Sequence, residues 1–165
     1  MAKPIPSLER LREVLSYNSE TGEFRWLIRC GRQAAGKQAG CLCRDGYVRL
    51  SVDGTLMNAQ RIAWVMYHGI WPAGDIDHAD MNRANNRISN LRLASRSENM
   101  ANSSKRSTNK SGYKGVSWCS FTGKWVAQIT LNGRNRKIGR FSDKEMAAQA
   151  YARVAAETWG QFSRS

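Results

Sequence analysis

The stretch that decides the fold runs from Asp75 to Asn99 and reads DIDHADMNRANNRISNLRLASRSEN. Its middle part, residues 79–90, is rich in Asn and Arg and precedes the apolar anchors Leu91 and Leu93. Such a polar segment suits a structured loop between two antiparallel strands. Ser95 then offers a side-chain oxygen that can cap the first turn of a helix. The stretch therefore predicts a strand, a loop, a second strand and a helix.

The same stretch carries the candidate catalytic residues. Asp77 is adjacent to His78, and Asn90 and Asn99 lie 12 and 21 residues beyond the histidine. The chain has two histidines, so chemistry that needs an imidazole base at neutral pH must use one of them. The other, His68, lies where a helix is expected to end, which favours a helix C-terminal residue over a ligand. An Asp-His pair alone is usually incidental, so the combination and its spacing carry the weight.

The residues before this stretch predict a small mixed module. Ser7 can cap a short amphipathic helix over residues 7–16, and strand-like pieces separated by glycine follow it. The Asp53-Gly54 dipeptide is a strong hairpin signal. Residues 58–68 are apolar enough for a second helix.

The residues after this stretch predict a second module on a basic tether. Residues 101–112 contain no large apolar residue and are typical of an extended linker. Ser142 and Glu145 form a capping-box pattern that would open a helix ending near Gly160. An Asn-Gly turn of type I′ would join the last two of three strands, which are expected at 113–118, 124–131 and 134–141. We therefore expect an α+β chain with domains at 1–100 and 113–165.

The charge of the chain points to a polyanionic partner. The 165 residues contain 26 Lys+Arg against 13 Asp+Glu, a formal net charge of +13. Residues 101–142 contain no acid, which favours a surface that follows phosphates over a solvated face of mixed charge. No apolar stretch approaches the roughly 18 residues of a membrane-spanning helix, and no secretory signal opens the chain. We therefore expect a nucleic acid rather than a membrane as the partner, and a cytoplasmic location; an RNA-binding or membrane-surface role has only the net charge in its favour.

The cysteines do not form a recognisable metal site. A cytosolic chain keeps its thiols reduced, and the four here are Cys30, Cys41, Cys43 and Cys119. The first three lack the usual C-x₂-C spacing and a fourth ligand nearby. We expect no structural zinc.

Residues 75–99 resemble the HNH endonuclease motif, or ββα-metal fold, of the phage and intron homing-endonuclease branch. The resemblance rests on a D-H pair, then N-N-R-x-x-N-L-R, then E-N, and it extends over residues 20–100. One departure is Gln60, where relatives often have histidine before the arginine. The implied fold is a ββα-metal nuclease module followed by a small three-stranded antiparallel sheet with one helix.

This resemblance implies a metal-dependent DNA endonuclease whose partner is double-stranded DNA. In that family His78 would deprotonate the attacking water, Asp77 and Asn99 would bind Mg²⁺ or Mn²⁺, and Asn90 would orient the histidine by tying the loop to its strand. General chemistry agrees, since hydrolysis of an anionic diester needs an activated water and neutralised charge, and oxygen ligands suit Mg²⁺. A single active site in a monomer favours nicking. Phosphate contacts are expected from Arg83, Arg87, Arg92 and Arg96.

Residues 111–163 resemble a second family, the ethylene-response-factor (APETALA-two) DNA-binding domain, in the segments 113–116, 123–129, 138–141 and 147–151. That family lays its sheet in the major groove. The implied outward residues are Lys114, Ser117, Cys119, Gln128, Thr130, Asn135 and Lys137, and the linker would add Lys105, Arg106 and Lys110. Gln128 and Asn135 are of the type that reads adenine edges. For Trp125, core packing is favoured over a DNA contact.

One alternative belongs to another functional class. The chain could be a sequence-specific DNA-binding protein that does not cleave, or a degenerate nuclease. The presence of Asp77, His78 and Asn99 together favours the enzyme.

Overall fold

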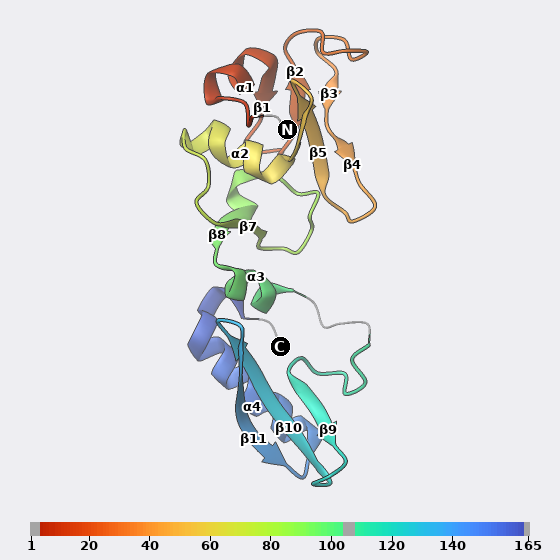
Figure 1. Ribbon diagram of the computed structural model, residues 1–165, viewed down its shortest axis with the longest axis vertical. Coiled ribbons are helices and arrows are strands. Elements are labelled where there is room, and N and C mark those ends of the chain that lie inside the picture. Colours follow the sequence, from red (N-terminus) through yellow and green to blue (C-terminus); the bar gives the residue numbers. More distant parts are fainter. Residues whose placement is uncertain (1–3, 104–107, 164–165) are drawn as a thin grey trace. The chain divides into compact units, whose positions relative to one another are not determined.

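The computed structural model describes residues 4–103 and 108–163 and divides into two compact units, Met1–Leu93 and Ala94–Ser165 (Figure 1). Both units mix helices with small antiparallel sheets, so the α+β fold class is confirmed. The division falls before residue 100, where the sequence analysis ended the first domain. Across the described residues, no helix has the length and apolar character that a bilayer crossing requires.

The first unit begins with a capped helix and two small sheets. In α1 (Leu8–Val14) the Ser7 hydroxyl accepts the Arg10 N–H at 3.2 Å, which confirms the predicted cap. One sheet has the order β1-β2-β3 and the other the order β4-β5-β6. Their strands are β1 (Leu15–Tyr17), β2 (Phe24–Trp26), β3 (Gln38–Ala39), β4 (Cys41–Leu42), β5 (Val48–Val52) and β6 (Thr55–Asn58). The β5–β6 turn has positive φ at Asp53 (51°) and Gly54 (78°), as the hairpin signal predicted.

Helix α2 (Ala59–His68) supplies much of the core of the first unit. Its Ile62 packs with Leu11 of α1, Phe24 of β2 and Leu50 of β5, all at most 2% exposed. Apolar burial of this kind is the main driving force for folding a unit of this size. The helix ends at Gly69 in the left-handed region (φ 79°), where the sequence predicted its end.

The expected strand, loop and strand follow α2. Strand β7 (Asp75–His78) pairs with β8 (Leu91–Ala94), and the single turn η1 (Ile88–Asn90) closes the loop between them. Helix α3 (Arg96–Asn102) comes next in the chain and belongs to the second unit, where it contacts α4 and η2. The Ser95 cap is confirmed as a full capping box with Glu98.

The second unit is a three-stranded antiparallel sheet with one long helix (Figure 1). The strand order is β11-β10-β9, from β9 (Val116–Cys119), β10 (Lys124–Leu131) and β11 (Arg134–Phe141). Helix α4 (Lys144–Trp159) packs on this sheet through a core that includes Ile129, Ala147 and Tyr151, and η2 (Gly160–Phe162) follows it.

The turn signal of the second unit is confirmed and its helix cap is corrected. Asn132 (φ 49°) and Gly133 (φ 77°) form the predicted turn between β10 and β11. The N-cap of α4 is Asp143, one residue after the predicted Ser142, because the Asp143 carboxylate accepts the Met146 N–H at 2.8 Å. A carboxylate at this position also stabilises the positive end of the helix dipole.

Candidate functional site

The pairing of β7 with β8 brings Asp77 against Arg92. The Arg92 Nε–H donates to Asp77 Oδ2 at 2.9 Å. The Arg92 Nη2 atom lies 2.8 Å from the same oxygen. These two atoms attract each other by their opposite charges, although their geometry is not that of a hydrogen bond. The two side chains are only 6% and 17% exposed, so water screens their charges weakly. Asp77, which was predicted as a metal ligand, is therefore paired with Arg92, which was predicted as a phosphate contact.

The imidazole of His78 is buried but has polar neighbours. Its Nε2 lies 3.4 Å from Oδ1 of Asn86, whose Nδ2 donates to the Ala84 carbonyl at 3.2 Å. Because an amide oxygen only accepts, the Nε2 atom carries the hydrogen of this pair. Burial lowers the pKa of His78 below its usual 6.5, although the hydrogen bond with Asn86 and the charge of Asp80 oppose the shift. The imidazole is therefore neutral at neutral pH, which a general base requires.

Asn90 closes the loop between the two strands. Its Nδ2 donates to Oδ1 of Asp80 and to the carbonyl of Asn85, both at 2.9 Å. Its own Oδ1 accepts the Asp80 N–H at 3.0 Å, and its backbone carbonyl accepts the N–H of Ala79 at 2.9 Å. These bonds join the start of the loop, just after His78, to its end. The effect of Asn90 on the histidine itself stays a prediction.

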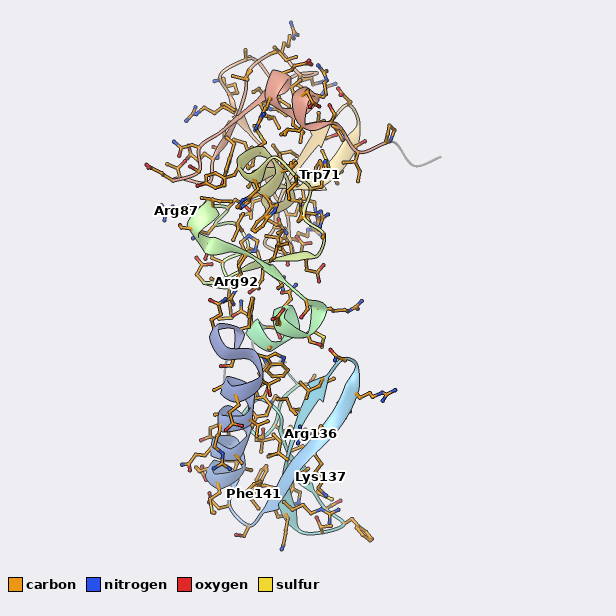
Figure 2. All side chains as sticks on the ribbon, turned by 90° about the vertical axis from the view of Figure 1, so that its left-hand side faces the viewer. Trp71, Arg87, Arg92, Arg136, Lys137 and Phe141 are labelled. Carbon is orange, nitrogen blue, oxygen red and sulfur yellow. The ribbon has the colours of Figure 1, made fainter. Side chains whose placement is uncertain are left out.

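Two of the predicted arginines lie on this loop. Arg83 is exposed, donates to the Asp45 carbonyl at 2.9 Å and places its guanidinium 4.9 Å from the centre of the Tyr47 ring. Arg87 is exposed at the start of η1 (Figure 2). Both offer positive charge to solvent beside the site, so their role as phosphate contacts stays a prediction.

The predicted metal ligands are an Asp77 carboxylate and an Asn99 amide. Asn99 lies half-buried on α3 of the second unit, and Arg96 begins the same helix with an exposed side chain. Within residues 4–103 and 108–163, no group of three or more His, Cys, Asp or Glu is arranged to hold a metal ion. A carboxylate and an amide oxygen are donor types that suit Mg²⁺, which keeps several waters and binds substrate phosphates rather than a full protein cage. The role of Asp77 and Asn99 as metal ligands stays a prediction.

One face of the second unit's sheet exposes the predicted DNA-reading residues. The register places Thr130 opposite Asn135 and Gln128 opposite Lys137, and all four are exposed, as is Ser117 on β9. The Thr130 hydroxyl donates to Oδ1 of Asn135 at 2.6 Å, which fixes the direction of that amide. The alternate residues of β10, Ala127 and Ile129, lie on the other face of the sheet and are buried under α4.

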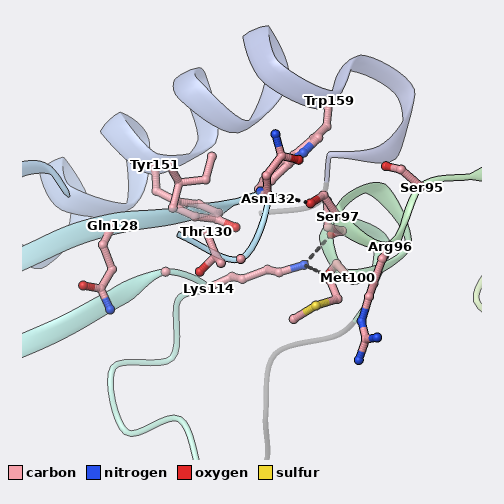
Figure 3. A pocket seen from close by; sticks show the side chains of 14 residues that line it. Ser95, Arg96, Ser97, Met100, Lys114, Gln128, Thr130, Asn132, Tyr151 and Trp159 are labelled. Atoms are coloured by element: carbon pink, nitrogen blue, oxygen red, sulfur yellow. Dashed lines mark hydrogen bonds between the residues drawn. The ribbon is translucent and has the colours of Figure 1, made fainter. Parts of the chain in front are cut away.

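Lys114 has a role that sequence reasoning did not foresee (Figure 3). Its ammonium donates to the carbonyls of Met100 at 3.1 Å and Ser103 at 2.8 Å, and also to that of Ala101. An ammonium has three donors, so these carbonyls at the end of α3 can engage all of them. A cavity of about 620 Å³ adjoins this contact, and Tyr151 and Trp159 lie along it. A DNA contact by Lys114 would require it to leave these carbonyls.

The remaining predicted linker contacts are only partly described. Lys110 is exposed, whereas Lys105 and Arg106 lie outside the described residues. Cys119 is half-buried on β9, and all four cysteines are free thiols. Trp125 is half-buried, packs against the core of the second unit and contacts Trp118 edge to face with ring centres 5.1 Å apart.

Sequence reasoning missed the partner of the histidine. Asn86 is 2% exposed, and besides its contact with His78 its carbonyl accepts the Tyr17 hydroxyl at 2.7 Å. The signal was present in the Asn85-Asn86 pair, but such a pair is usually only a turn. Burial of the Asn86 amide distinguishes a partner of His78 from a simple turn residue, and this burial cannot be seen in the sequence.

Three comparisons with known proteins bear on this site. A solved structure described as "DNA binding and cleavage by the HNH homing endonuclease I-HmuI" is similar with a TM-score of 0.47 and 19% identity, over 94% of this chain and 82% of that one. An uncharacterised HNH endonuclease of Acanthamoeba polyphaga mimivirus is 38% identical over 88 residues, which is 53% of this chain but 44% of that protein.

A phage protein is matched over most of its length. Protein 3.8 of Escherichia phage T7 is 36% identical over 102 residues, covering 61% of this chain and 84% of that protein. Residues 58–101, which hold α2, the β7–β8 pair and most of α3, match the HNH endonuclease family. The chain therefore belongs to one family with phage T7 Protein 3.8 and carries an HNH endonuclease domain at residues 58–101.

Proposed function

We propose that this chain is a metal-dependent DNA endonuclease of the homing type that hydrolyses phosphodiester bonds. The observation that carries the proposal is a neutral, buried His78 beside Asp77, in a segment that matches the HNH endonuclease family. Further parts of the proposal are that the protein is phage or intron encoded, acts as a monomer in the host cytoplasm and nicks one strand at a time.

His78 acts as the general base in this proposal. With the hydrogen on Nε2 shared with Asn86, the Nδ1 atom holds the lone pair that accepts a proton from water. The lowered pKa of His78 keeps this lone pair available at neutral pH. Asn86 and Asn90 are positioning residues, the first by fixing the ring and the second by fixing the loop that follows it.

The charge of the phosphate is neutralised by cations. Asp77 and Asn99 are the residues that would hold Mg²⁺ or Mn²⁺, and such an ion, when bound, stabilises the charge that develops on the phosphate and on the leaving oxygen. The exposed Arg83 and Arg87 would hold the flanking phosphates.

The second unit binds and positions the DNA in this proposal. Arg134, Arg136 and Lys137 are exposed on β11, and no acidic residue lies between residues 101 and 142 to repel phosphates. Gln128 and Asn135 on the exposed face would contact base edges in the major groove. This mode follows the resemblance to the ethylene-response-factor domain and would make the affinity fall steeply with salt.

One observation favours a second candidate, a DNA-binding protein that does not cleave. Asp77 already has a buried cationic partner in Arg92, which competes with any metal ion for its carboxylate. The two functions differ in a single assay. Supercoiled plasmid is incubated with the protein in Mg²⁺ or Mn²⁺, with and without EDTA. Metal-dependent nicked plasmid supports the nuclease, whereas retarded but intact plasmid in every metal supports the binding protein.

A further inference from the structure

The guanidinium of Arg92 contacts the Asp77 carboxylate in an uncommon way. Two nitrogens of Arg92 converge on one oxygen, Oδ2, at 2.9 Å and 2.8 Å, rather than each taking one oxygen of the carboxylate. Arginine fits a carboxylate best with two parallel hydrogen bonds. The pair is therefore buried, but the geometry of this contact is not the one that binds arginine most tightly.

A divalent cation and this guanidinium cannot share the same oxygen. Like charges at contact distance repel strongly where water is largely excluded, and Asp77 and Arg92 are 6% and 17% exposed. Removing the guanidinium without a replacement would take a compensating positive charge away from a buried carboxylate, which is unfavourable. Metal binding at Asp77 therefore requires that the ion arrive as the guanidinium leaves.

A DNA phosphate supplies a partner for the released guanidinium. Phosphate oxygens accept two parallel hydrogen bonds from arginine, the geometry that Asp77 does not provide. The short β8 strand holds the Arg92 backbone beside β7, so a change of side-chain rotamer is sufficient for the exchange.

We propose that Arg92 occupies the metal-binding oxygen of Asp77 in the free protein and transfers to a DNA phosphate when a divalent cation binds. Arg92 is then a positioning residue that couples the two ligands. Coupling of this kind is reciprocal: DNA tightens metal binding, and metal tightens DNA binding, by the same factor. This inference rests on the proposed function, because it needs a metal at Asp77 and DNA at the site.

The test measures metal binding rather than cleavage. Mn²⁺ is titrated calorimetrically into His78→Ala, which prevents cutting, and into the double variant with Arg92→Gln, each with and without a 30-base-pair duplex of mixed sequence. Without DNA, the double variant is expected to bind Mn²⁺ about tenfold more tightly, and the duplex is expected to tighten Mn²⁺ binding about tenfold in His78→Ala only. Unchanged or weaker Mn²⁺ binding in the double variant overturns the proposal.

Two control variants separate the exchange from a general loss of charge. Arg25→Gln removes an exposed cation on β2 of the first unit and is expected to leave the Mn²⁺ affinity unchanged. Arg92→Lys restores the positive charge and is expected to return the affinity toward the starting value. Equal tightening by Arg25→Gln would show that net charge alone is responsible and would overturn the proposal.

Thermal unfolding with and without Mn²⁺ is the control that the variants are folded. Arg92→Gln removes a cation from beside the buried Asp77 carboxylate, so the unfolding temperature of this variant is expected to rise more with Mn²⁺ than that of the original protein. A variant that stays unfolded at millimolar Mn²⁺ contradicts the proposal. If the wild-type protein nicks plasmid but Arg92→Gln binds Mn²⁺ no more tightly than the protein with Arg92, only this inference fails. If the wild-type protein does not nick plasmid, the proposed function fails.

Discussion

Residues 79–90 of the first unit and the strand β11 of the second unit both contain Asn and Arg, yet they use their asparagines in opposite ways. In the loop, Asn86 and Asn90 are 2% and 9% exposed and bond to their neighbours within the loop or to His78. On β11 the four residues from Arg134 to Lys137 are all exposed. Composition alone therefore does not separate a segment that builds a rigid site from one that offers charge to a partner.

The difference comes from the surroundings of each segment. The loop is closed at both ends by paired strands and the Tyr17 hydroxyl bonds to its Asn86 carbonyl, so its buried amides must find partners inside the protein. The strand β11 lies at the edge of its sheet, and only one of its faces meets α4. If this comparison is correct, changes in the loop alter chemistry and changes in β11 alter affinity.

The largest expected effect comes from Gly115→Ala, which tests whether the second unit folds as described. An added Cβ would lie 2.2 Å from the Tyr151 ring and 2.7 Å from the Gln128 carbonyl, at a φ of +68°. We expect a loss of about 3–5 kcal/mol in the stability of the second unit, from the strained φ and the overpacking. Calorimetric unfolding of the full chain measures it.

The control for this variant is Gly112→Ala, which has a φ of +83° but open space around the added methyl. It should cost only about 1 kcal/mol, from the backbone alone. Equal losses in the two variants would mean that Tyr151 does not pack against residue 115.

Gly22→Ala should act on the loop of the first unit instead. The added Cβ would lie 2.6 Å from the Arg87 nitrogen and 2.7 Å from the Asn86 carbonyl carbon, so the backbone beside the His78 partner must move. We expect a loss of about 2–4 kcal/mol in stability together with slower cleavage. DNA affinity, measured by fluorescence anisotropy at a temperature where the variant is folded, should fall much less than the cleavage rate, because Arg87 is only one of several proposed phosphate contacts. Gly36→Ala, at a similar φ of +80° but in open space, is the matched control and should retain cleavage.

Asn86→Asp should shift the pH dependence of cleavage. Burial holds the pKa of His78 below 6.5, so wild-type cleavage should fall on acidification only below that pH. A carboxylate in place of the amide oxygen favours the protonated imidazole and should raise this midpoint by about one unit or more. A single-turnover pH profile measures both midpoints, and an unshifted profile would mean that Asn86 does not contact the catalytic base.

The same histidine affects stability with a defined sign. Because its folded pKa is lower than its unfolded value, the unfolded chain binds the proton more readily. Its contribution to stability is therefore complete above pH 6.5 and is lost as the pH falls through the folded pKa. Asn86→Asp should reduce this acid sensitivity, which unfolding temperatures between pH 5 and pH 7 would reveal.

Arg136→Gln is expected to have the smallest effect. Loss of one phosphate contact should lower the slope of log K against log salt by about 0.9 and weaken DNA binding several-fold at low salt. Cleavage within the bound complex should be unchanged. Arg153→Gln, an exposed cation on α4, is the matched control and should leave the slope unaltered. Equal slopes for the two variants would remove β11 from the DNA interface.

The sequence was informative where one residue determines a local structure. The caps at Ser7 and Ser95, the end of α2 at Gly69 and the turn at Asn132 were all predicted from single side chains or dipeptides. Each depends on backbone φ or on a hydrogen bond within three residues, which is information that the local sequence contains. The cap of α4 failed by one residue because Ser142 and Asp143 are both good cap residues and only the structure shows which one bonds.

The site was harder to predict because its contacts join distant residues. Arg92 reaches Asp77 across a strand pair, and Lys114 reaches the carbonyls at the end of α3. Arg92 was predicted as a phosphate contact and Lys114 as a DNA-binding residue of the sheet, since a cation in a basic chain gives no sign of an internal partner. Such pairings depend on tertiary packing, which local sequence patterns do not encode.

The most direct test of the division between cutting and binding measures both on one plasmid. His78→Ala and wild type are compared for nicking in Mg²⁺ and for affinity in EDTA. We predict that the variant binds with the wild-type affinity and nicks about 10²–10⁴-fold more slowly, the usual contribution of a general base. Nicking by His78→Ala at the wild-type rate would contradict the account.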